Sequence, residues 1–356
     1  MLVSDPMAHA LHVPSWPAAA AVLALTAGCT PGAPAGGVSR IVERTQIAMG
    51  SELHLTAWTA NEAAADAAFA RVFAEFDRLE GLMSVWREDS DIQRLNQAAG
   101  EHPVPVSVEV REVLTIARQV SEWTEGRFDV TFGALGDLWK FDHDQDNHIP
   151  DPNEVKLRLQ LVNYRDLLID EAAGTVYLRR KGMRANLGGI GKGYAVDRGV
   201  SLLRGSGLRD FMIQAGGDLY VAGRKGDRPW RLGIQDPRGP ANRSFASIEL
   251  TDATFSTSGD YERSFLKEGR RYHHILDLSV GEPARGCRSV TLVTDRAVIA
   301  DALAKGVFIL GPAAGMALIE RTRGVQGVIV SARNEVLVSS GLKDRLTLLA
   351  PPTDGP

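Results

Sequence analysis

The chain has 356 residues, 44% of them hydrophobic, which is enough to bury a substantial core as one large domain or two medium ones. Its formal net charge is −4 and its basic residues are scattered, so the sequence lacks the electrostatic footprint of a nucleic-acid-binding protein. Two cysteines are too few for a disulfide framework.

The first feature in chain order is an apolar leader. Pro17–Gly28 is apolar with small residues at its end, and Cys29 follows directly. A run of this length is too short to span a bilayer as a helix, but it matches the core of a signal peptide. The cysteine resembles a bacterial lipobox, so we predict a signal peptide over 1–29 with Cys29 lipidated. Thr26 in the place usual for Leu leaves an ordinary signal peptide or a disordered leader as alternatives.

A linker and one folded domain follow the leader. Residues 30–39 are rich in Pro, Gly, Ala and Ser and have too few large apolar groups to pack, which suits a flexible tether. We predict one folded domain over 40–345 and a disordered tail over 346–356.

Hydrophobic periodicity predicts both helices and strands within this domain. In the first part, these are a strand over Glu52–Trp58, helices over Asn61–Met83, Asp91–Ala99 and Ser107–Trp123, and a hairpin of Asp166–Asp170 with Thr175–Arg179. In the second part, they are strands over Asp210–Gln214, Trp230–Gln235, Phe245–Leu250, Tyr272–Leu276 and Arg288–Thr294, helices over Ala297–Leu310 and Ala313–Arg323, and a hairpin of Val325–Val330 with Glu335–Ser339. Strands joined by short turns pair antiparallel, so we expect an α+β fold of antiparallel sheets packed with helices.

The densest chemical signal is the glycine-rich segment Asn186–Asp197. It holds four glycines within six residues ahead of a helical pattern, and Lys192 lies among them. Backbone N–H groups at such a helix start suit an anion such as a pyrophosphate. The segment matches neither the P-loop nor the dinucleotide fingerprint. Taken alone, it fits an anion site and a structural turn with a solvated Lys192 equally well.

Four further segments carry polar groups suited to chemistry. Asp218 follows a predicted strand, where a buried carboxylate at a sheet end is placed, and residues 256–262 combine small hydroxyls with Gly and Asp. His273 and His274 lie on one predicted strand, so at most one ring faces a given site. Asp301 interrupts an apolar helix, where a carboxylate needs a partner or a metal.

Together these segments resemble the FAD:protein FMN transferase family, also called the ApbE family. The resemblance runs from about Arg40 to Leu342. Its motifs, in order, are Met49–Ser51, Leu82–Trp86, Ser90–Asn96, Phe128–Thr131, Gly188–Asp197, Gly216–Asp218, Gly233–Pro237, Thr257–Glu262, His273–Ile275 and Ala300–Leu303.

The resemblance implies cleavage of FAD at its pyrophosphate, transfer of FMN to a threonine of another protein through a phosphoester bond, and release of AMP. It implies an FAD pocket lined by Met49, Trp86, Asp129, Val130, Thr131, Asn186, Lys192 and Ile275. His274 is the candidate base. The implied partner is an acceptor flavoprotein, such as an FMN-binding subunit of a membrane electron-transport complex. With the lipid anchor, we expect the periplasmic side of a bacterial membrane, the inner one favoured, or secretion into the periplasm as the alternative.

The sequence departs from the family at this same pocket. Asn186 replaces the usual Asp, and 277–281 lacks the usual Pro and Thr. In the family, Mg²⁺ is held by an Asp, a Thr four residues later and a glycine-loop carbonyl, which correspond here to Asp301, Lys305 and Gly191. A protonated lysine has no lone pair for a metal, but it can pair with Asp301 at this i,i+4 spacing.

Three hypotheses follow from Lys305. The favoured one is an active transferase in which Mg²⁺ binds differently or the ammonium partly replaces it. The second is a catalytically impaired FAD-binding or regulatory homologue, and the third is an FAD pyrophosphate hydrolase. A separate acidic segment, Asp142–Glu154, is similar to a calcium loop, but Asn153 stands where the last ligand belongs. We favour a solvated acidic loop that caps a helix starting near Pro152.

Overall fold

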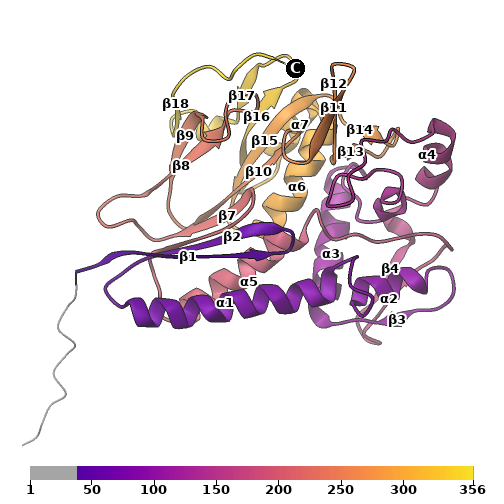
Figure 1. Ribbon diagram of the computed structural model, residues 1–356, viewed down its shortest axis with the longest axis horizontal. Helices are drawn as coiled ribbons and strands as arrows, with labels where there is room; N and C mark the ends of the chain where they lie inside the picture. The colour runs from indigo at the N-terminus through magenta and orange to yellow at the C-terminus, as the bar shows by residue number, and fades with distance from the viewer. Residues whose placement is uncertain (1–37, 356) are drawn as a thin grey trace, which may run out of the picture. The chain divides into compact units, whose positions relative to one another are not determined.

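The structure, a computed structural model, describes residues 38–355. Within them, the central element is an eight-stranded sheet whose neighbouring strands are all antiparallel (Figure 1). In spatial order its strands are β1 (Arg40–Ala48), β2 (Ser51–Thr59), β6 (Phe211–Ala215), β7 (Asp218–Ala222), β10 (Ala253–Gly259), β15 (Cys287–Thr294), β16 (Gln326–Ser331) and β17 (Val336–Val338). Every position of β15 is buried, so both faces of the sheet are covered there.

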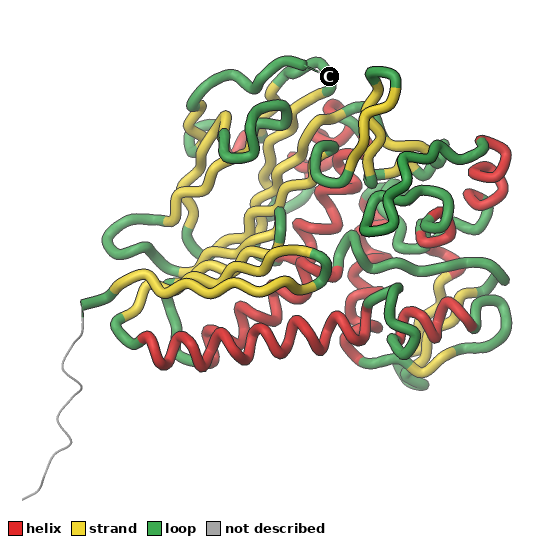
Figure 2. The backbone as a smooth tube through the Cα atoms, viewed as in Figure 1, coloured by secondary structure: helices red, strands yellow, loops and turns green. Residues whose placement is uncertain are grey.

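Helices cover one face of this sheet. They are α1 (Glu62–Met83), α5 (Gly191–Gly205), α6 (Ala297–Leu310) and α7 (Pro312–Arg321), and α3 (Val108–Trp123) packs on α6 outside them. α1 packs on α5, α5 packs on α6, and α6 lies against β10 and β15. Figure 2 shows these helices grouped along one side of the strands. α6 is thereby buried between the sheet and its neighbouring helices, which is why most of its residues are apolar.

A smaller sheet covers the other face. Its strands, in spatial order, are β18 (Leu346–Leu348), β9 (Ser244–Leu250) and β8 (Trp230–Gln235). Trp230 and Phe245 of this sheet cluster with Val221, Phe255 and Val293 of the large one. The two sheets therefore bury a second apolar core, opposite the core that the helices share with the large sheet.

Short elements fill the remaining part of the described chain. They are α2 (Asp91–Gln97), α4 (Pro152–Leu159), β3 (Val104–Pro105), β4 (Leu167–Asp170), β5 (Thr175–Leu178), the hairpin β11 (Ser264–Lys267) with β12 (Arg270–His273), and β13 (Leu276–Asp277) with β14 (Glu282–Pro283). An aromatic cluster joins several of them: Phe265 and Tyr272 stack at 5.2 Å, and Phe141 and Trp139 continue the stack.

The α+β class and the helix starts agree with the sequence analysis. Ser107 caps α3 by accepting from the Val110 N–H at 3.4 Å. Asp151 caps α4 by accepting from the Asn153 N–H at 2.8 Å, as expected for a helix starting near Pro152. Caps of this kind are local, because a side chain binds an N–H two or three residues along the chain, so the sequence predicts them well.

Several strands were missed. We did not predict β1, β7 or β10, and the strand predicted over Tyr272–Leu276 breaks after His273. β7 is buried at all five positions and therefore lacks the polar alternation that marks a half-buried strand. β10 contains residues 256–259 of the segment 256–262, whose serines and glycine are not typical of a strand.

The prediction of a disordered tail over 346–356 is wrong for residues 346–355. β18 pairs with β9, and the Thr353 hydroxyl donates to the Asp236 carboxylate at 2.7 Å. The Arg243 guanidinium also donates to the Thr353 hydroxyl, at 2.6 Å. Long-range polar partners fix a segment whose composition alone suggests fraying.

The predicted signal peptide, the lipidation of Cys29 and all but the last two residues of the linker 30–39 lie outside the described residues. Within residues 38–355, no helix combines the length and the hydrophobicity that crossing a bilayer requires.

Candidate functional site

Two adjoining cavities lie at one end of the helix-covered core, within the described part of the chain. The first, of about 200 Å³, is lined by His274, Ile275, Asp129 and Lys305 among others, and we call it the His274 cavity. The second, of about 630 Å³, is lined by Met49 and Lys192 among others, and we call it the Met49 cavity. Their shared walls include Trp86, Asn186 and Arg263. The two cavities together suit an elongated ligand with two parts.

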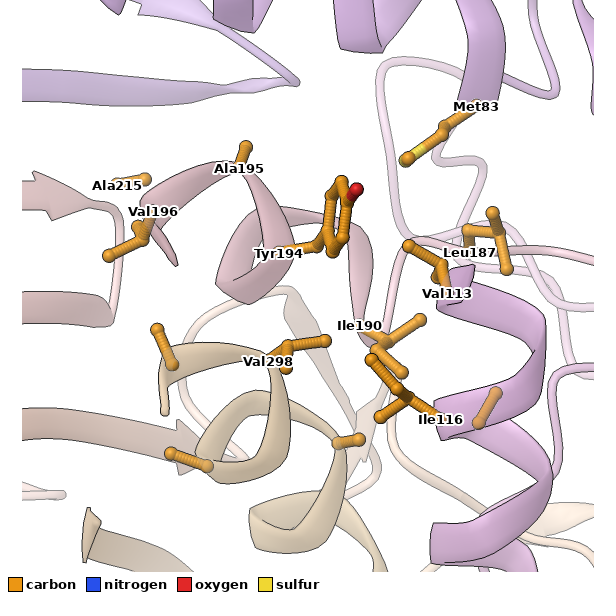
Figure 3. Packing of buried hydrophobic residues seen from close by; sticks show 14 of the residues in the cluster. Met83, Val113, Ile116, Leu187, Ile190, Tyr194, Ala195, Val196, Ala215 and Val298 are labelled. Atoms are coloured by element: carbon orange, nitrogen blue, oxygen red, sulfur yellow. The ribbon is translucent and has the colours of Figure 1, made fainter. Parts of the chain in front are cut away.

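The glycine-rich segment contributes residues to the walls of both cavities. Its apolar residues Leu187 and Ile190 are buried, and Figure 3 shows them among side chains of α3 and the end of α1. Asn186 accepts from the Gly188 N–H at 2.8 Å, which tightens the turn. Apolar anchors thus hold the loop while Gly188 faces the cavities.

Two glycines of this segment make room for different neighbours. A Cβ at Gly193 would lie 2.3 Å from the Ala297 carbonyl oxygen, so this glycine permits the close crossing of α5 and α6. A Cβ at Gly189 would lie 3.2 Å from Cδ of Lys305, so this glycine makes room for the lysine. Part of the segment is therefore structural, and part of it lines the cavities.

The N-terminus of α5 opens on the Met49 cavity. Gly191, its first residue, and Lys192 line that cavity, and within residues 38–355 no side chain caps this helix end in the usual position. The N–H groups of a helix's first turn carry partial positive charge. One of them, the Gly193 N–H, donates to the Asp301 carboxylate at 2.9 Å. This end of the helix is suited to bind an anion.

Lys192 is paired with a buried carboxylate. Its ammonium lies 3.2 Å from the Asp218 carboxylate, which also accepts from the Ser256 hydroxyl. Burial works against the charged form of Lys192, but Asp301 and Asp218 outweigh it and raise the pKa of the lysine. Lys192 is therefore a cation at the cavity wall, where the sequence had left a solvated surface lysine open as the alternative.

Lys305 is paired with Asp301, as the i,i+4 spacing predicted. Its ammonium binds the Asp301 side-chain carboxylate and lies 2.9 Å from the Asp301 carbonyl oxygen. Burial favours the neutral acid at Asp301, but Lys305 and Lys192 outweigh it and lower the pKa of this carboxyl. Asp301 is fully buried and ionised, and Lys305 reaches the His274 cavity above it.

A divalent cation does not fit this set of residues. One Asp301 oxygen binds the Lys305 ammonium and the other accepts from Gly193. Within the described residues, no group of three or more His, Cys, Asp and Glu is arranged to hold a metal. A divalent ion about 4 Å from the ammonium would be repelled by about 8 kcal/mol at an effective dielectric constant of 20. The metal site predicted from Gly191, Asp301 and Lys305 is therefore not formed by this arrangement.

The two neighbouring histidines differ in their partners. His273 is buried, its Nε2 lies 2.8 Å from the Ala284 carbonyl oxygen, and its Nδ1 accepts from the Ile275 N–H at 3.3 Å. His274 lines the cavity, and its buried Nδ1 has no hydrogen-bond partner within residues 38–355. Burial, followed by the positive charges of Arg263 and Lys305, holds the pKa of His274 well below its usual value. His274 is thus a neutral imidazole with a free nitrogen.

Trp86 and the start of the acidic segment form the outer wall. Trp86 is 58% exposed, and its ring meets the edge of the His143 ring at 4.6 Å between centroids. Arg263 forms an ion pair with Asp142, and both residues line the two cavities. No sequence pattern indicated Arg263, and Asp142 was predicted to lie in a solvated loop. Their pairing joins residues 121 positions apart, which no local pattern reports.

The prediction that Val130 and Thr131 line the pocket differs from the structure, which buries both beneath Asp129. The Asp129 carboxylate accepts from the Thr131 N–H at 2.8 Å and from the Tyr164 N–H at 2.6 Å. Asp129 therefore points its charge into the protein, and what it presents to the His274 cavity is the surface of a rigid turn.

Met49 occupies an unusual backbone conformation. It lies in the two-residue turn between β1 and β2, with φ of 50° followed by 67° at Gly50. Positive φ is uncommon for a residue with a side chain, and such strain is concentrated at functional sites. The Met49 N–H donates to the Glu80 carboxylate at 2.9 Å, which helps to hold the turn at the cavity.

Comparison with known proteins agrees with this architecture. The sequence pattern of the ApbE family matches residues 49–329. An FAD:protein FMN transferase of Klebsiella pneumoniae is 30% identical over 87% of this chain and 96% of its own length. Another, from Treponema pallidum, is 32% identical over 88% of this chain and 91% of its own length.

Among solved structures, the ApbE protein of Thermotoga maritima superposes with a TM-score of 0.79 at 30% identity, over 86% of this chain and 99% of that one. Both the sequence and the arrangement of the elements are thus shared over nearly the whole described region. This chain belongs to the ApbE family.

Proposed function

We propose that this protein is an FAD:protein FMN transferase, which cleaves FAD, attaches FMN to a threonine of an acceptor flavoprotein and releases AMP. The observation that carries the proposal is the neutral His274 in a cavity that Lys305 and Arg263 also line, next to the cavity that Lys192 and the N-terminus of α5 line. Group transfer from a pyrophosphate needs both a base for the incoming hydroxyl and positive charge at the phosphates.

The two cavities match the shape of the proposed substrate. FAD has two ring systems joined by a pyrophosphate, and the shared wall of the cavities includes Arg263 and the exposed indole of Trp86. An exposed aromatic ring suits stacking on a flavin or an adenine. The pyrophosphate is expected near the ammonium of Lys192 and the N-terminus of α5, which both line the Met49 cavity.

The chemical step follows from this placement. The acceptor threonine oxygen attacks the phosphorus of the FMN half, and a new P–O bond forms. The bond from that phosphorus to the bridging oxygen breaks, and AMP leaves with the bridging oxygen. The hydroxyl proton moves to the imidazole of His274, which is neutral and lines the cavity. Two negative charges on the bound pyrophosphate would offset Arg263 and Lys305, so His274 becomes more basic once substrate is present.

The acceptor and the location are part of the proposal. The acceptor is an exported flavoprotein, such as an FMN-binding subunit of a membrane electron-transport complex. The leader with Cys29 supports lipid anchoring on the periplasmic side of a bacterial membrane, more simply the inner one. Radiolabelled palmitate incorporation that is lost in Cys29→Ser tests the anchor, and release of an unlabelled protein into the periplasm would favour an ordinary signal peptide.

The activity is tested by incubating the protein with FAD and a threonine-bearing acceptor, then reading covalent flavin fluorescence in a denaturing gel. Labelling that is absent from a Thr→Val acceptor supports the transferase. AMP release without labelling would replace it with the FAD pyrophosphate hydrolase. FAD binding with neither product would identify an impaired FAD-binding or regulatory homologue.

A further inference from the structure

The side chain of Lys305 is held in place by the glycine-rich segment and by Asp301. Its aliphatic chain passes over Gly189, where any side chain would crowd Cδ at 3.2 Å. Its side chain is only 15% exposed, and its ammonium binds both the carboxylate and the carbonyl oxygen of Asp301. An ammonium has three N–H donors, so one donor remains for a ligand in the His274 cavity, which Lys305 lines.

Carboxylates already pair with the two lysines of the site before a ligand arrives. Lys192 lies on Asp218 and Lys305 on Asp301, and burial together with the charge of Asp301 raises the pKa of Asp218. A pyrophosphate diester brings two negative charges to these two ammonium groups. The two ammonium groups can each share a donor with it while remaining on their carboxylates, so positive charge is already in place when the phosphates bind.

We propose that the Lys305 ammonium, anchored on Asp301, is the resident cation of this site in place of a divalent metal, so that FAD binds and reacts without added Mg²⁺. The inference rests on the proposed function for the identity of the substrate. It is supported by the occupied oxygens of Asp301, by the repulsion between the ammonium and a second cation, and by the space that Gly189 leaves for the lysine.

The alternative is that the Lys305–Asp301 ion pair only stabilises the fold. The two readings differ in what happens when the lysine is replaced by threonine. If the pair is only structural, Lys305→Thr lowers the melting temperature and leaves the metal dependence of FAD binding unchanged. If the ammonium is the resident cation, Lys305→Thr frees the Asp301 carboxylate for a metal, and FAD binding becomes dependent on a divalent ion.

The decisive measurement is the dissociation constant of FAD, from flavin fluorescence, for the full mature chain in EDTA and in Mg²⁺. We expect the wild-type constants to agree within about twofold. For Lys305→Thr, we expect at least a tenfold weaker constant in EDTA that Mg²⁺ restores. Lys343→Thr, an exposed lysine on the far C-terminal segment, is the matched control and should behave as the wild type.

Metal binding supplies a readout that does not depend on activity or on FAD. Electron paramagnetic resonance with Mn²⁺ should find no stoichiometric bound ion in the wild type and about one in Lys305→Thr. If that variant does not fold, the wild-type measurements still decide. One Mn²⁺ bound per wild-type chain, or FAD binding weakened tenfold by EDTA, would overturn the inference.

The inference and the proposed function fail in different ways. FAD binding that ignores EDTA, without labelling of any acceptor, would leave Lys305 as the resident cation and remove the transferase. Labelling that requires Mg²⁺ in the wild type would keep the transferase and remove the role of Lys305. No FAD binding under either condition would overturn both.

Discussion

Two buried ion pairs in this protein have the same formal charges and different consequences. At the cavities, the ammonium of Lys305 rests on Asp301. Beside the small sheet, the guanidinium of Arg238 binds both oxygens of Asp260, each at 2.7 Å, and both side chains are only 9% exposed. A guanidinium fork fixes a carboxylate through two parallel bonds, whereas an ammonium is a point charge with donors to spare.

The difference shows that the motifs carrying the family resemblance have two kinds of role. Asp260 and Asp236 both lie in segments that carry the family resemblance. The structure assigns them to the scaffold, because Asp260 is held by Arg238 and Asp236 receives the C-terminal Thr353. Asp218 and Asp301 are buried too, but their lysine partners reach the cavities. Among these four buried acids, the two paired with lysine lie at the cavities, and the two held by Arg238 or Thr353 belong to the scaffold.

We expect the largest effect from a substitution in the His274 cavity. His274→Ala removes the proposed base, and we expect the rate of FMN transfer to fall by about 10²–10⁴-fold. FAD affinity should change by only a few fold, since the positive charges at Lys192 and Lys305 remain. Single-turnover labelling and fluorescence titration measure the two quantities. His273→Ala should instead act on folding, because His273 binds the backbone. Equal rates for wild type and His274→Ala would remove His274 from the mechanism.

The scaffold pair should respond in stability. Arg238→Met leaves Asp260 buried without its fork, and we expect a loss of about 3–5 kcal/mol in the free energy of unfolding. The double variant Arg238→Met with Asp260→Leu should recover much of this loss, because no unpaired charge remains. Urea denaturation measures both variants. A tenfold change in FAD affinity at unchanged stability would contradict the division between scaffold and site.

Asp197 is a partly buried carboxylate that accepts hydrogen bonds from backbone groups. Asp197 accepts from the N–H groups of Ala297 and Val298 at the start of α6, at 2.7 and 3.1 Å. Burial, only partly offset by these bonds, raises the pKa of Asp197 to about 6. The folded state then binds more protons than the unfolded state between about pH 4 and pH 6, so this contribution to stability is present at low pH and is lost as pH rises.

The change across this window is up to about 3 kcal/mol, from a shift of about two pKa units. Asp197→Asn should lack this pH-dependent part. Thermal melting of both proteins from pH 4 to pH 7 should show the wild type losing stability relative to the variant as pH increases. Parallel curves would mean that Asp197 titrates normally.

The smallest effect concerns the C-terminal segment. Thr353→Val removes the hydroxyl that donates to Asp236 at 2.7 Å, and we expect a loss of about 1–3 kcal/mol in the free energy of unfolding. Thr347→Val changes an exposed threonine of the same segment and serves as the control. If both variants have the melting temperature of the wild type, the Thr353 hydroxyl does not stabilise the fold.

The sequence by itself determined the features that depend on neighbours along the chain. The capped helices, the glycine-rich turn before α5 and the i,i+4 pair of Asp301 with Lys305 all follow from spacings of a few residues. The ordered motifs determined the family, because many weak matches in one order are specific when taken together.

The tertiary structure alone decided which distant groups meet. It paired Lys192 with Asp218, Arg263 with Asp142 and Thr353 with Asp236, and it turned the Asp129 carboxylate away from the pocket. It also revealed β7, whose fully buried residues carry no alternating pattern. The reason is common to these cases: burial and long-range polar pairing depend on which surfaces pack together, and a local sequence pattern does not contain that information.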